Sequence, residues 1–533
     1  MQASRWSVVV ALVAFASCAS QPSRSRATAA PRPNIILFLV DDMGQQDVSE
    51  PMLSADERTP VNLRFTTPNV EALAARGVKA SDAHAAAPVC TPSRTAILTG
   101  QCPARTHITF WTLEKDSPPT GTHDRVRAPD WNGWGAQPSP TTWPALLSAA
   151  GYRTIHAGKA HFGARDTPGA DPLHMGFDVN IAGHAAGAPS SYLGQHAFSE
   201  AGKQAAQNNE PLDAAKVGAS VWDVPGLEKY HGSDVWLDDA LARESCAAIA
   251  GAVAAGEPFA LNFCPYGVHA PIMMDDRYAH LSEGKDLDPP ERKYISMVAA
   301  VDDALGSIVR CCEDLGVLDN TYIIFTSDNG GLSAHARGRA PDGQRAHTHN
   351  APLRNGKGSA SEGGTRVPFI AAGPGIAPAS QPLAATITGT DLYPTLLAMA
   401  GVAAPAEGPC DGVNVLPLLT GESTTVHRPA AIIVHQPHQW GSKERDIEPF
   451  TSIRDGDWKL IWYHDGPRVE LYNLRLDLSE TIDLAGQEPD RASELLALLR
   501  TRMEALGGQW SIDKATGAAI VPGVSRHSAP AVR

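Results

Sequence analysis

Two apolar runs, each followed at once by oxygen-bearing side chains, constrain the fold more than any other feature of this chain. Residues 34–40 precede Asp41 and Asp42, and residues 322–326 precede a serine, an aspartate and an asparagine. A continuous apolar run suits a strand that is buried on both faces of a mostly parallel sheet, and open sheets of this kind bind ligands at the carboxyl ends of their strands. The predicted fold class is therefore α/β. An acidic turn after a strand is the plainer interpretation of either pattern alone.

Apolar periodicity and turn residues locate further elements. Helices are expected over residues 68–76, 144–150, 234–255, 294–315, 391–400 and 489–506, and strands over residues 152–157, 259–263 and 367–372. Residues 105–140 and 183–227 show little periodicity and are predicted to be loops.

The character of the sequence changes near residue 425. Short strands separated by Asp-Gly turns are expected at residues 450–454, 458–463 and 470–473. This pattern is typical of an antiparallel sheet. We therefore predict a large domain over residues 33–425 and a small antiparallel-sheet-plus-helix domain with a tail over residues 426–533.

Residues 1–32 are interpreted as a signal peptide and a flexible tether. Arg5 precedes an apolar stretch over residues 8–15, and small residues then lead to Cys18, which looks like a lipoprotein processing site. A lipid on Cys18 would tether the protein to a membrane without spanning it, and cleavage by a secretory peptidase is the alternative. The protein is expected to be periplasmic or tethered to the outer membrane, or otherwise secreted.

The net charge limits the partners. A formal charge of −14 at pH 7 argues against nucleic acid or an anionic membrane surface as a partner. A small anionic substrate remains compatible with this charge, because a few local cations can govern a site.

The chain has eight cysteines. With Cys18 and Cys90 set aside, six remain that could pair in an oxidising compartment, but their connectivity cannot be deduced from sequence. The adjacent Cys311 and Cys312 cannot easily bridge each other.

The stretch that begins at Cys90 carries the strongest functional signal. It reads Cys-Thr-Pro-Ser-Arg and continues to Gly100 through an apolar run, which places Cys90 at a loop-to-helix junction where amides and the helix dipole favour negative charge. For an arbitrary cysteine, a buried small hydrophobe or half of a disulfide is the plainer interpretation. The residues around Cys90 favour a catalytic role instead.

Cys-x-Pro-Ser-Arg with a following Thr-Gly resembles the signature of the type I sulfatases, which are members of the alkaline phosphatase superfamily. The resemblance implies that a maturation enzyme converts Cys90 to formylglycine (3-oxoalanine), whose hydrate carries two hydroxyls on one carbon. One hydroxyl would attack sulfur and the other would later expel sulfate, while Arg94, one helical turn on, would hold the hydrate. It also implies an alkaline-phosphatase-like mixed, mostly parallel sheet flanked by helices, with a smaller C-terminal α+β domain.

Three further segments resemble sulfatase motifs and supply the rest of the expected site. In Gly-Lys-x-His-x-Gly, the resemblance implies that Lys159 binds a sulfate oxygen and that His161 contacts the formylglycine hydroxyls. His269, which precedes Ala-Pro after a predicted strand, is a looser match and is expected to protonate the leaving group. Lys357, in the segment of residues 352–368, is expected to touch the sulfate. On its own, a lysine and a histidine after a strand would more often be surface residues.

The oxygen-bearing side chains at the two strand ends are expected to hold a metal ion. Asp41, Asp42, Asp328 and Asn329, with an oxygen from the modified residue 90, make an all-oxygen site for a hard divalent cation. The number of carboxylates and the absence of thiolates favour calcium over magnesium, and zinc is the least favoured.

The predicted function is hydrolysis of a sulfate ester of a sulfated carbohydrate or an aryl sulfate. Trp111, Trp131 and Trp134 could offer platforms for sugar rings, and pinning of their loop to the core is an equal alternative. Two other functions stay open: a phosphonate or phosphate diester hydrolase of the same superfamily, and a non-catalytic lipoprotein that binds sulfated glycans if Cys90 is not oxidised.

A polar stretch rich in histidine and arginine lies between Asn329 and the segment of residues 352–368. Its residues are His335, Arg337, Arg339, Arg345, His347 and His349. A solvated loop or a cationic substrate subsite is favoured there over a second metal site.

Overall fold

The computed structural model describes residues 32–523 apart from residues 117–120, 334–336, 338–348, 441–446 and 467. The predicted signal peptide and Cys18 therefore lie outside the described residues, as do His335, Arg339, Arg345 and His347. None of the described helices is long and apolar enough to cross a membrane.

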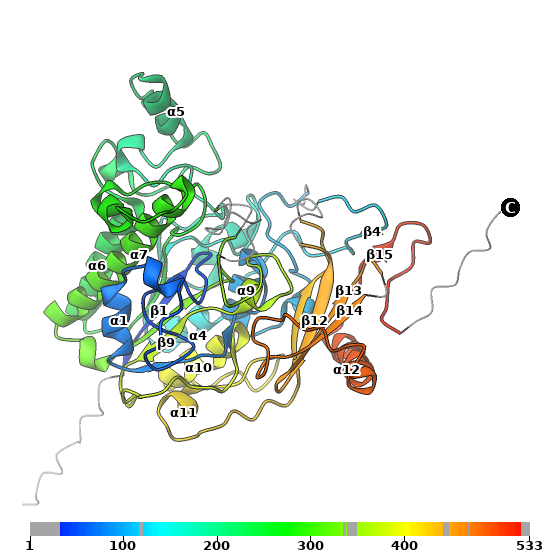
Figure 1. Cartoon of the computed structure of the whole chain (residues 1–533). Helices are drawn as coiled ribbons and strands as arrows, with labels where there is room; N and C mark the ends of the chain where they lie inside the picture. The colour runs from blue at the N-terminus through cyan, green and yellow to red at the C-terminus, as the bar shows by residue number, and fades with distance from the viewer. Residues whose placement is uncertain are drawn as a thin grey trace, which may run out of the picture. The chain divides into compact units, whose positions relative to one another are not determined.

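A central sheet organises the larger part of the chain (Figure 1). Among the described residues it has seven strands in the order β2-β9-β8-β1-β7-β5-β6. The strands are β1 (Asn34–Val40), β2 (Val78–Lys79), β5 (Arg153–Gly158), β6 (Val179–Ile181), β7 (Phe259–Cys264), β8 (Thr321–Ser327) and β9 (Phe369–Ala372). The strands from β8 to β6 run parallel, while β9 and β2 form an antiparallel edge. The predicted mixed, mostly parallel α/β sheet is confirmed.

Helices cover both faces of this sheet. The helices on one face are α1 (Pro68–Ala74), α6 (Leu237–Ala255) and α7 (Pro289–Asp314), and those on the other are α4 (Trp143–Ala149), α10 (Leu392–Met399) and α11 (Leu416–Leu419). Alternate residues of β1 face the two layers, with Phe38 on the α7 side and Leu37 on the α10 side. Burial on both faces explains why the run from Asn34 to Val40 is apolar without alternation.

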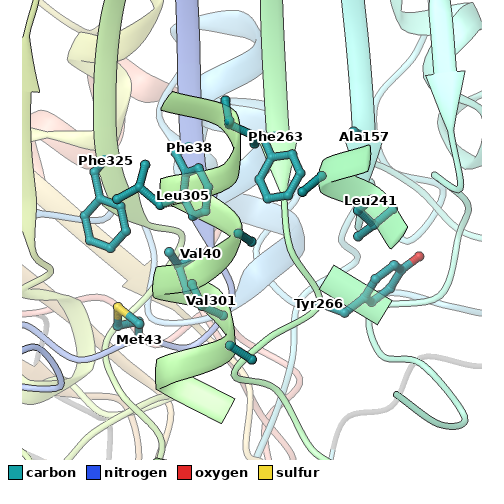
Figure 2. Close-up of a cluster of buried hydrophobic side chains, with 14 of the residues drawn as sticks. Phe38, Val40, Met43, Ala157, Leu241, Phe263, Tyr266, Val301, Leu305 and Phe325 are labelled. Atoms are coloured by element: carbon teal, nitrogen blue, oxygen red, sulfur yellow. The ribbon is translucent and has the colours of Figure 1, made fainter. Parts of the chain in front are cut away.

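Aromatic packing fixes the middle of the sheet. The ring of Phe38 lies 4.8 Å from that of Phe263 on β7 and 5.5 Å from that of Phe325 on β8, measured between centroids. Figure 2 shows these three rings with Val301 and Leu305 of α7 against them. Full burial of one such side chain contributes about 1.5–3 kcal/mol, so this cluster holds together the three strands whose carboxyl ends carry the site.

The predicted loop over residues 183–227 contains a helix, and in this respect the prediction is wrong. Helix α5 spans Glu200–Asn208, the Ser199 side chain caps its first turn by accepting from the amide of Gly202, and Asn209 ends it in the left-handed conformation. Its alanines and glutamines favour a helix. They leave little apolar periodicity to recognise, because much of α5 faces solvent.

A second sheet follows the central one in sequence. Among the described residues it has four antiparallel strands: β11 (Ile432–Gln436), β12 (Phe450–Asp455), β13 (Trp458–Tyr463) and β14 (Val469–Asn473). Helix α12 (Pro489–Leu506) packs its apolar face on this sheet. Three of the strands and the helix match the sequence-based expectations, whereas β11 was not predicted. The domain boundary at residue 425 stays a prediction.

Ion pairs fasten this second sheet to the segment before β9, and those made by Lys459 are buried. Lys459 Nζ on β13 lies 2.9 Å from an oxygen of Glu362 and 2.9 Å from an oxygen of Glu480. Arg354 reaches Glu470 on β14 at 3.1 Å. Removing one partner of a buried pair leaves an uncompensated charge, which costs about 3–5 kcal/mol. The segment is therefore held at a defined position against the sheet.

Two buried histidines of the second sheet are held in the neutral form by burial and are joined by a chain of hydrogen bonds. His435 Nε2 lies 2.8 Å from the carbonyl of Gln509, so it donates, and Nδ1 accepts from Thr451 Oγ1 at 2.8 Å. The same hydroxyl oxygen lies 2.9 Å from His464 Nε2. Burial lowers the pKa of His435 to about 3 and holds the pKa of His464 well below its usual value.

The first prediction concerns the pH dependence of stability. In the unfolded chain His435 binds a proton near its ordinary pKa of 6.5, whereas in the folded protein it stays neutral down to about pH 3. The folded state therefore loses stability as the pH falls through this window. The destabilisation caused by His435→Gln, measured by urea unfolding, should shrink by about 2 kcal/mol between about pH 7 and about pH 5. His174→Gln, at an exposed histidine, is the control. If the loss of unfolding free energy caused by His435→Gln is the same at both pH values, His435 is not held neutral in the folded protein.

Candidate active site

The carboxyl ends of the central strands bring the predicted site residues to one place. Asp41 and Asp42 follow β1, Asp328 follows β8, and Cys90 opens helix α2 (Cys90–Thr99). Each of these four residues offers one possible ligand atom, and the four atoms all lie within 4.8 Å of one another. Five further predicted residues contact this group directly: Arg94, Lys159, His269, Asn329 and Lys357. The ring of His161 contacts the carbonyl of Thr112 and lies close enough to Lys159 and Arg94 for their charges to act on it.

The carboxylates are crowded and lie away from water. Asp41, Asp42 and Asp328 are fully buried. Burial raises the pKa of Asp41 to about 8, and the neighbouring charges of Asp42 and Asp328 act in the same direction. Asp42 also adopts a left-handed backbone conformation with φ of 62°, which costs an aspartate on the order of 1 kcal/mol. Grouping these carboxylate oxygens therefore has an unfavourable electrostatic contribution and an unfavourable backbone contribution to stability.

Buried cations offset this negative charge. Lys159 Nζ lies 2.7 Å from both oxygens of Asp41, and Lys357 Nζ lies 2.6 Å from Asp42 Oδ1. Burial opposes ionisation of Asp42, but Lys357 and the nearby His269 outweigh burial and lower the pKa of Asp42. The two lysines are thus held charged at the bottom of the site.

Arg94 is oriented by two hydrogen bonds. Its Nε donates to Asp328 Oδ2 at 2.7 Å, and its Nη1 donates to the carbonyl of Lys159 at 2.7 Å. Its Nη2 is buried without a hydrogen-bond partner among the described residues and lies 3.9 Å from Asp41 Oδ1. One arm of the guanidinium therefore stays free to bind an oxygen anion.

The donor set fits a hard divalent cation. Asn329 Nδ2 donates to Asp42 Oδ1 at 2.8 Å, which turns Asn329 Oδ1 away, and within the described part of the chain that buried oxygen has no hydrogen-bond partner. Three carboxylates and an amide oxygen without a donor are ligands that calcium and magnesium prefer. The alternative of a plain acidic turn does not explain why these oxygens are buried together.

The thiol of Cys90 is poorly suited to act as a nucleophile in its unmodified form. Its Sγ lies 3.7 Å from Asp41 Oδ1 and 4.0 Å from Asp42 Oδ1. Burial raises the pKa of Cys90 to about 12, although Lys159 and Lys357 act against this rise. A cysteine that stays protonated is neither a strong nucleophile nor a ligand for a hard cation.

His161 presents an unprotonated nitrogen. Its Nε2 lies 2.9 Å from the carbonyl of Thr112, and because a carbonyl only accepts, Nε2 carries the proton. Nδ1 is then the acceptor, and it has no hydrogen-bond partner among the residues described. Burial lowers the pKa of His161 well below its usual value, and Lys159 and Arg94 lower it further. His161 is therefore a neutral ring with a free lone pair.

His269 lies at the more open side of the site. Its side chain keeps 21% of its surface exposed, and its Nε2 lies 3.5 Å from Asp42 Oδ2. Its Nδ1 donates to the carbonyl of Ala270 at 2.7 Å, so Nε2 is the nitrogen that can exchange a proton. Burial and the charge of Lys357 lower the pKa of His269 to about 3. A bound sulfate ester would favour its protonated form, because an adjacent negative charge raises the pKa of a histidine.

The segment around Lys357 is held by backbone contacts to two loops and by a side chain of the second sheet. The amide of Lys357 donates to the carbonyl of Gly331 at 2.9 Å. The amide of Gly358 donates to the carbonyl of Pro88 at 2.8 Å. Gln436 on β11 donates to the carbonyl of Gly358 at 3.0 Å. The second sheet therefore supports both the lysine and the approach to Cys90.

Sequence reasoning missed a supporting network behind the predicted metal ligands. Asp47 accepts hydrogen bonds from the amide of Gly44 at 2.9 Å, from Tyr294 Oη at 2.8 Å and from Arg337 Nη1 at 2.9 Å. Arg337 and His349 are fully buried, so the solvated-loop interpretation is wrong for these two residues. The only sequence signal was that Asp47 follows Asp41 by six positions, which does not indicate a buried partner.

The predicted aromatic platforms have different surroundings. Trp131 packs against Phe110 and His438, at centroid distances of 6.5 Å and 5.0 Å, and so pins its loop. Trp134 is 48% exposed, with Lys115 Nζ 4.9 Å from the centre of its ring. Trp111 packs on a small apolar cluster with Ala185 and Ala186, close in sequence to Thr112, which holds His161.

Comparisons with known proteins agree with this geometry. The chain matches the family model described as Sulfatase over residues 33–402 and the model described as N-sulphoglucosamine sulphohydrolase, C-terminal, over residues 357–509. N-acetylgalactosamine-6-sulfatase of Sus scrofa is 33% identical over 404 residues, which are 74% of this chain and 68% of that protein. A sulfatase of Formosa agariphila is 27% identical over 514 residues, 89% of this chain and 88% of the relative. The crystal structure of Ps i-CgsB in complex with k-i-k-neocarrahexaose has a TM-score of 0.68 and 27% identity, covering 89% of this chain and 93% of the other.

The second prediction tests the position of His161. A Cβ added at Gly187 would lie 2.4 Å from His161 Cε1 and 2.5 Å from its Nδ1, so Gly187→Ala must displace the ring. A misplacement of about 1 Å at a reacting group costs on the order of 100-fold in rate, and a loss of this order is expected in the turnover of para-nitrophenyl sulfate. Gly251→Ala on α6, where an added Cβ meets nothing within 4 Å, should leave turnover unchanged. Equal turnover rates of the two variants would show that His161 takes no part in the reaction.

Proposed function

The chain belongs to the sulfatase family, and we propose that it removes sulfate from a sulfated carbohydrate by means of an oxidised residue 90 and a bound divalent cation. The observation that carries this proposal is the position of Cys90 beside three buried carboxylates, two lysines and an arginine. A carbohydrate substrate is supported by a relative named for N-acetylgalactosamine 6-sulfate and by a structural neighbour solved with a neocarrahexaose.

Formylglycine at position 90 would supply the nucleophile. Its hydrate offers two hydroxyls on one carbon: one attacks sulfur, and the other loses its proton as the bond to sulfate breaks and the aldehyde re-forms. A serine lacks the second hydroxyl. The site favours an oxygen at this position because the thiol of Cys90 is held protonated.

The buried cations bind the sulfate group. Lys159 and Lys357 are charged, are aimed at the same cluster and can each exchange a carboxylate contact for a sulfate oxygen. Arg94 has a free Nη2 for an oxygen of the nucleophile. Fixed donors of this kind stabilise the charge that develops in the transition state without reorganising.

Two histidines move the protons. His269 Nε2 protonates the oxygen of the departing alcohol, since its Nδ1 is committed to the carbonyl of Ala270. His161 Nδ1 accepts the proton of the second hydroxyl, since its Nε2 is committed to the carbonyl of Thr112. Each backbone contact fixes which nitrogen is available, so the acid and the base stay distinct.

Asp41, Asp42, Asp328 and Asn329 would hold the divalent cation together with the oxygen of residue 90. A bound cation lowers the pKa of a coordinated hydroxyl and withdraws charge from sulfate oxygens. The number of carboxylates favours calcium over magnesium.

The cellular setting is also part of the proposal. The signal-like residues 1–32 support export, with either a lipid on Cys18 or a free mature end, and thus a periplasmic, outer-membrane-tethered or secreted enzyme. A maturation enzyme that oxidises Cys90 is the required partner.

A phosphonate or phosphate diester hydrolase is the alternative with the same nucleophile. It differs in the charge and shape of the group that the lysines bind, so the ratio of turnover for an aryl sulfate and an aryl phosphonate monoester separates the two functions. A higher turnover of the phosphonate would replace the proposed function.

The third prediction concerns the modification of residue 90. In protein purified from its native host, the peptide that contains Cys90 should have the mass of an aldehyde or its hydrate in place of the thiol. Cys90→Ser expressed in the same way should be folded and inactive, because serine cannot expel sulfate. An unmodified thiol in active protein would contradict the mechanism, and an unmodified thiol in inactive protein that binds sulfated glycans would favour the non-catalytic alternative.

The fourth prediction concerns the cation. After treatment with a chelator, addition of calcium should raise the melting temperature and restore turnover, because a ligand that binds only the folded state stabilises it. Asp328→Asn should weaken calcium binding at least ~10-fold, in line with the loss of one carboxylate ligand. Asp319→Asn, at an exposed aspartate, is the matched control. A melting temperature that does not respond to either calcium or magnesium would contradict the proposed site.

A further inference from the structure

The helices α6 and α7 lie side by side on one face of the central sheet (Figure 1) and carry cysteines in their common seam. Cys246 lies in the middle of α6, and Cys311 lies in the last turn of α7. Both residues are partly exposed.

Each sulfur lies against the backbone of the other helix. Cys246 Sγ is 3.8 Å from the carbonyl oxygen of Ser307, which is one turn before Cys311 on α7. Cys311 Sγ is 3.9 Å from the carbonyl oxygen of Cys246 itself. Each cysteine side chain therefore reaches across the seam to the other helix, which places the two sulfur atoms in one region.

The other cysteines in the described part of the chain have different surroundings. Cys312 follows Cys311 on the helix and points into the apolar core. Cys102 and Cys264 are buried, and Cys410 is exposed and lies 3.5 Å from the carbonyl of Gly412. Six cysteines allow fifteen pairings in principle, and the geometry favours the one between α6 and α7.

We propose that Cys246 and Cys311 are a modification site, where a disulfide links α6 to α7 under oxidising conditions. The thiolate of one cysteine attacks a sulfur of a small disulfide oxidant and releases one thiolate from it. The second cysteine then loses its proton, attacks the sulfur of the first cysteine in the mixed disulfide and releases the second thiol. Two protein thiols lose two electrons and two protons, and the oxidant is reduced to two thiols.

The bridge would brace the two helices that support the catalytic loops. Asp238, in the first turn of α6, accepts the amide of Tyr266 at 3.0 Å, close to His269. Tyr294 on α7 donates to Asp47, behind the metal-binding residues. A covalent link between these helices restricts the unfolded chain and so stabilises the folded one.

The fifth prediction is tested by peptide mapping of the full-length protein, which does not depend on sulfatase activity. The purified protein is incubated with oxidised glutathione, its remaining thiols are alkylated, and the digest is analysed by mass spectrometry without reduction. We expect the peptides that carry Cys246 and Cys311 to be joined, with the loss of two hydrogen atoms. Recovery of both cysteines alkylated, a persistent glutathione adduct on Cys311, or a bridge to another cysteine would overturn the proposal.

Thermal unfolding supplies a second readout. The oxidised wild type should melt about 3–6 °C above the reduced protein, and Cys246→Ser and Cys311→Ser should each abolish this difference. Cys410→Ser, at an exposed cysteine outside the seam, should keep it. Equal melting temperatures of oxidised and reduced wild type would also overturn the proposed bridge, whereas failure of the sulfatase proposal would leave both readouts unaffected.

Discussion

The repulsion among three buried carboxylates is the constraint on which the rest of the active-site architecture depends. Asp41, Asp42 and Asp328 sit where water cannot screen them, so their charge has to be met by Lys159, Lys357 and other nearby cations. A cluster that contains both signs at close range can bind a metal cation and a sulfate anion together, because each bound ion takes over contacts that the side chains otherwise make with one another.

The fold places these charges with rigid elements rather than with loops alone. Strands β1 and β8 are paired in register from Asn34–Thr321 to Val40–Ser327. The residues that follow the two strands therefore lie side by side at the same edge of the sheet. The second sheet helps to position Lys357, because Gln436 on β11 donates a hydrogen bond to Gly358, the next residue in the chain. Precise placement matters at such a site, since electrostatic stabilisation of a transition state depends on donors that are already oriented.

Sequence reasoning succeeded where a residue's environment is determined by its neighbours in the chain. The apolar run of β1 is buried on both faces, and the helix that begins at Cys90 follows from Pro92 and the apolar residues after it. It did not identify Arg337, because a buried arginine is explained only by Asp47 and Glu291, which are distant in sequence. Nor could it assign the free nitrogen of His161, which is set by the carbonyl of Thr112. The roles of the site residues in the reaction remain predictions.

The environment of Cys90 explains why a cysteine would be converted before use. A thiolate at this position would be a soft ligand facing hard oxygen donors, and the buried site raises the pKa of the thiol to about 12. Two lysines nearby do not reverse this effect, since their charge is already engaged by Asp41 and Asp42. Replacing sulfur by oxygen would change both properties at once: the side chain would become a ligand suited to a hard cation, and such a cation would favour the ionised hydroxyl. Burial suppresses the thiolate, and Asp41 and Asp328 add to this effect; by recruiting the cation, the same carboxylates would activate an oxygen nucleophile.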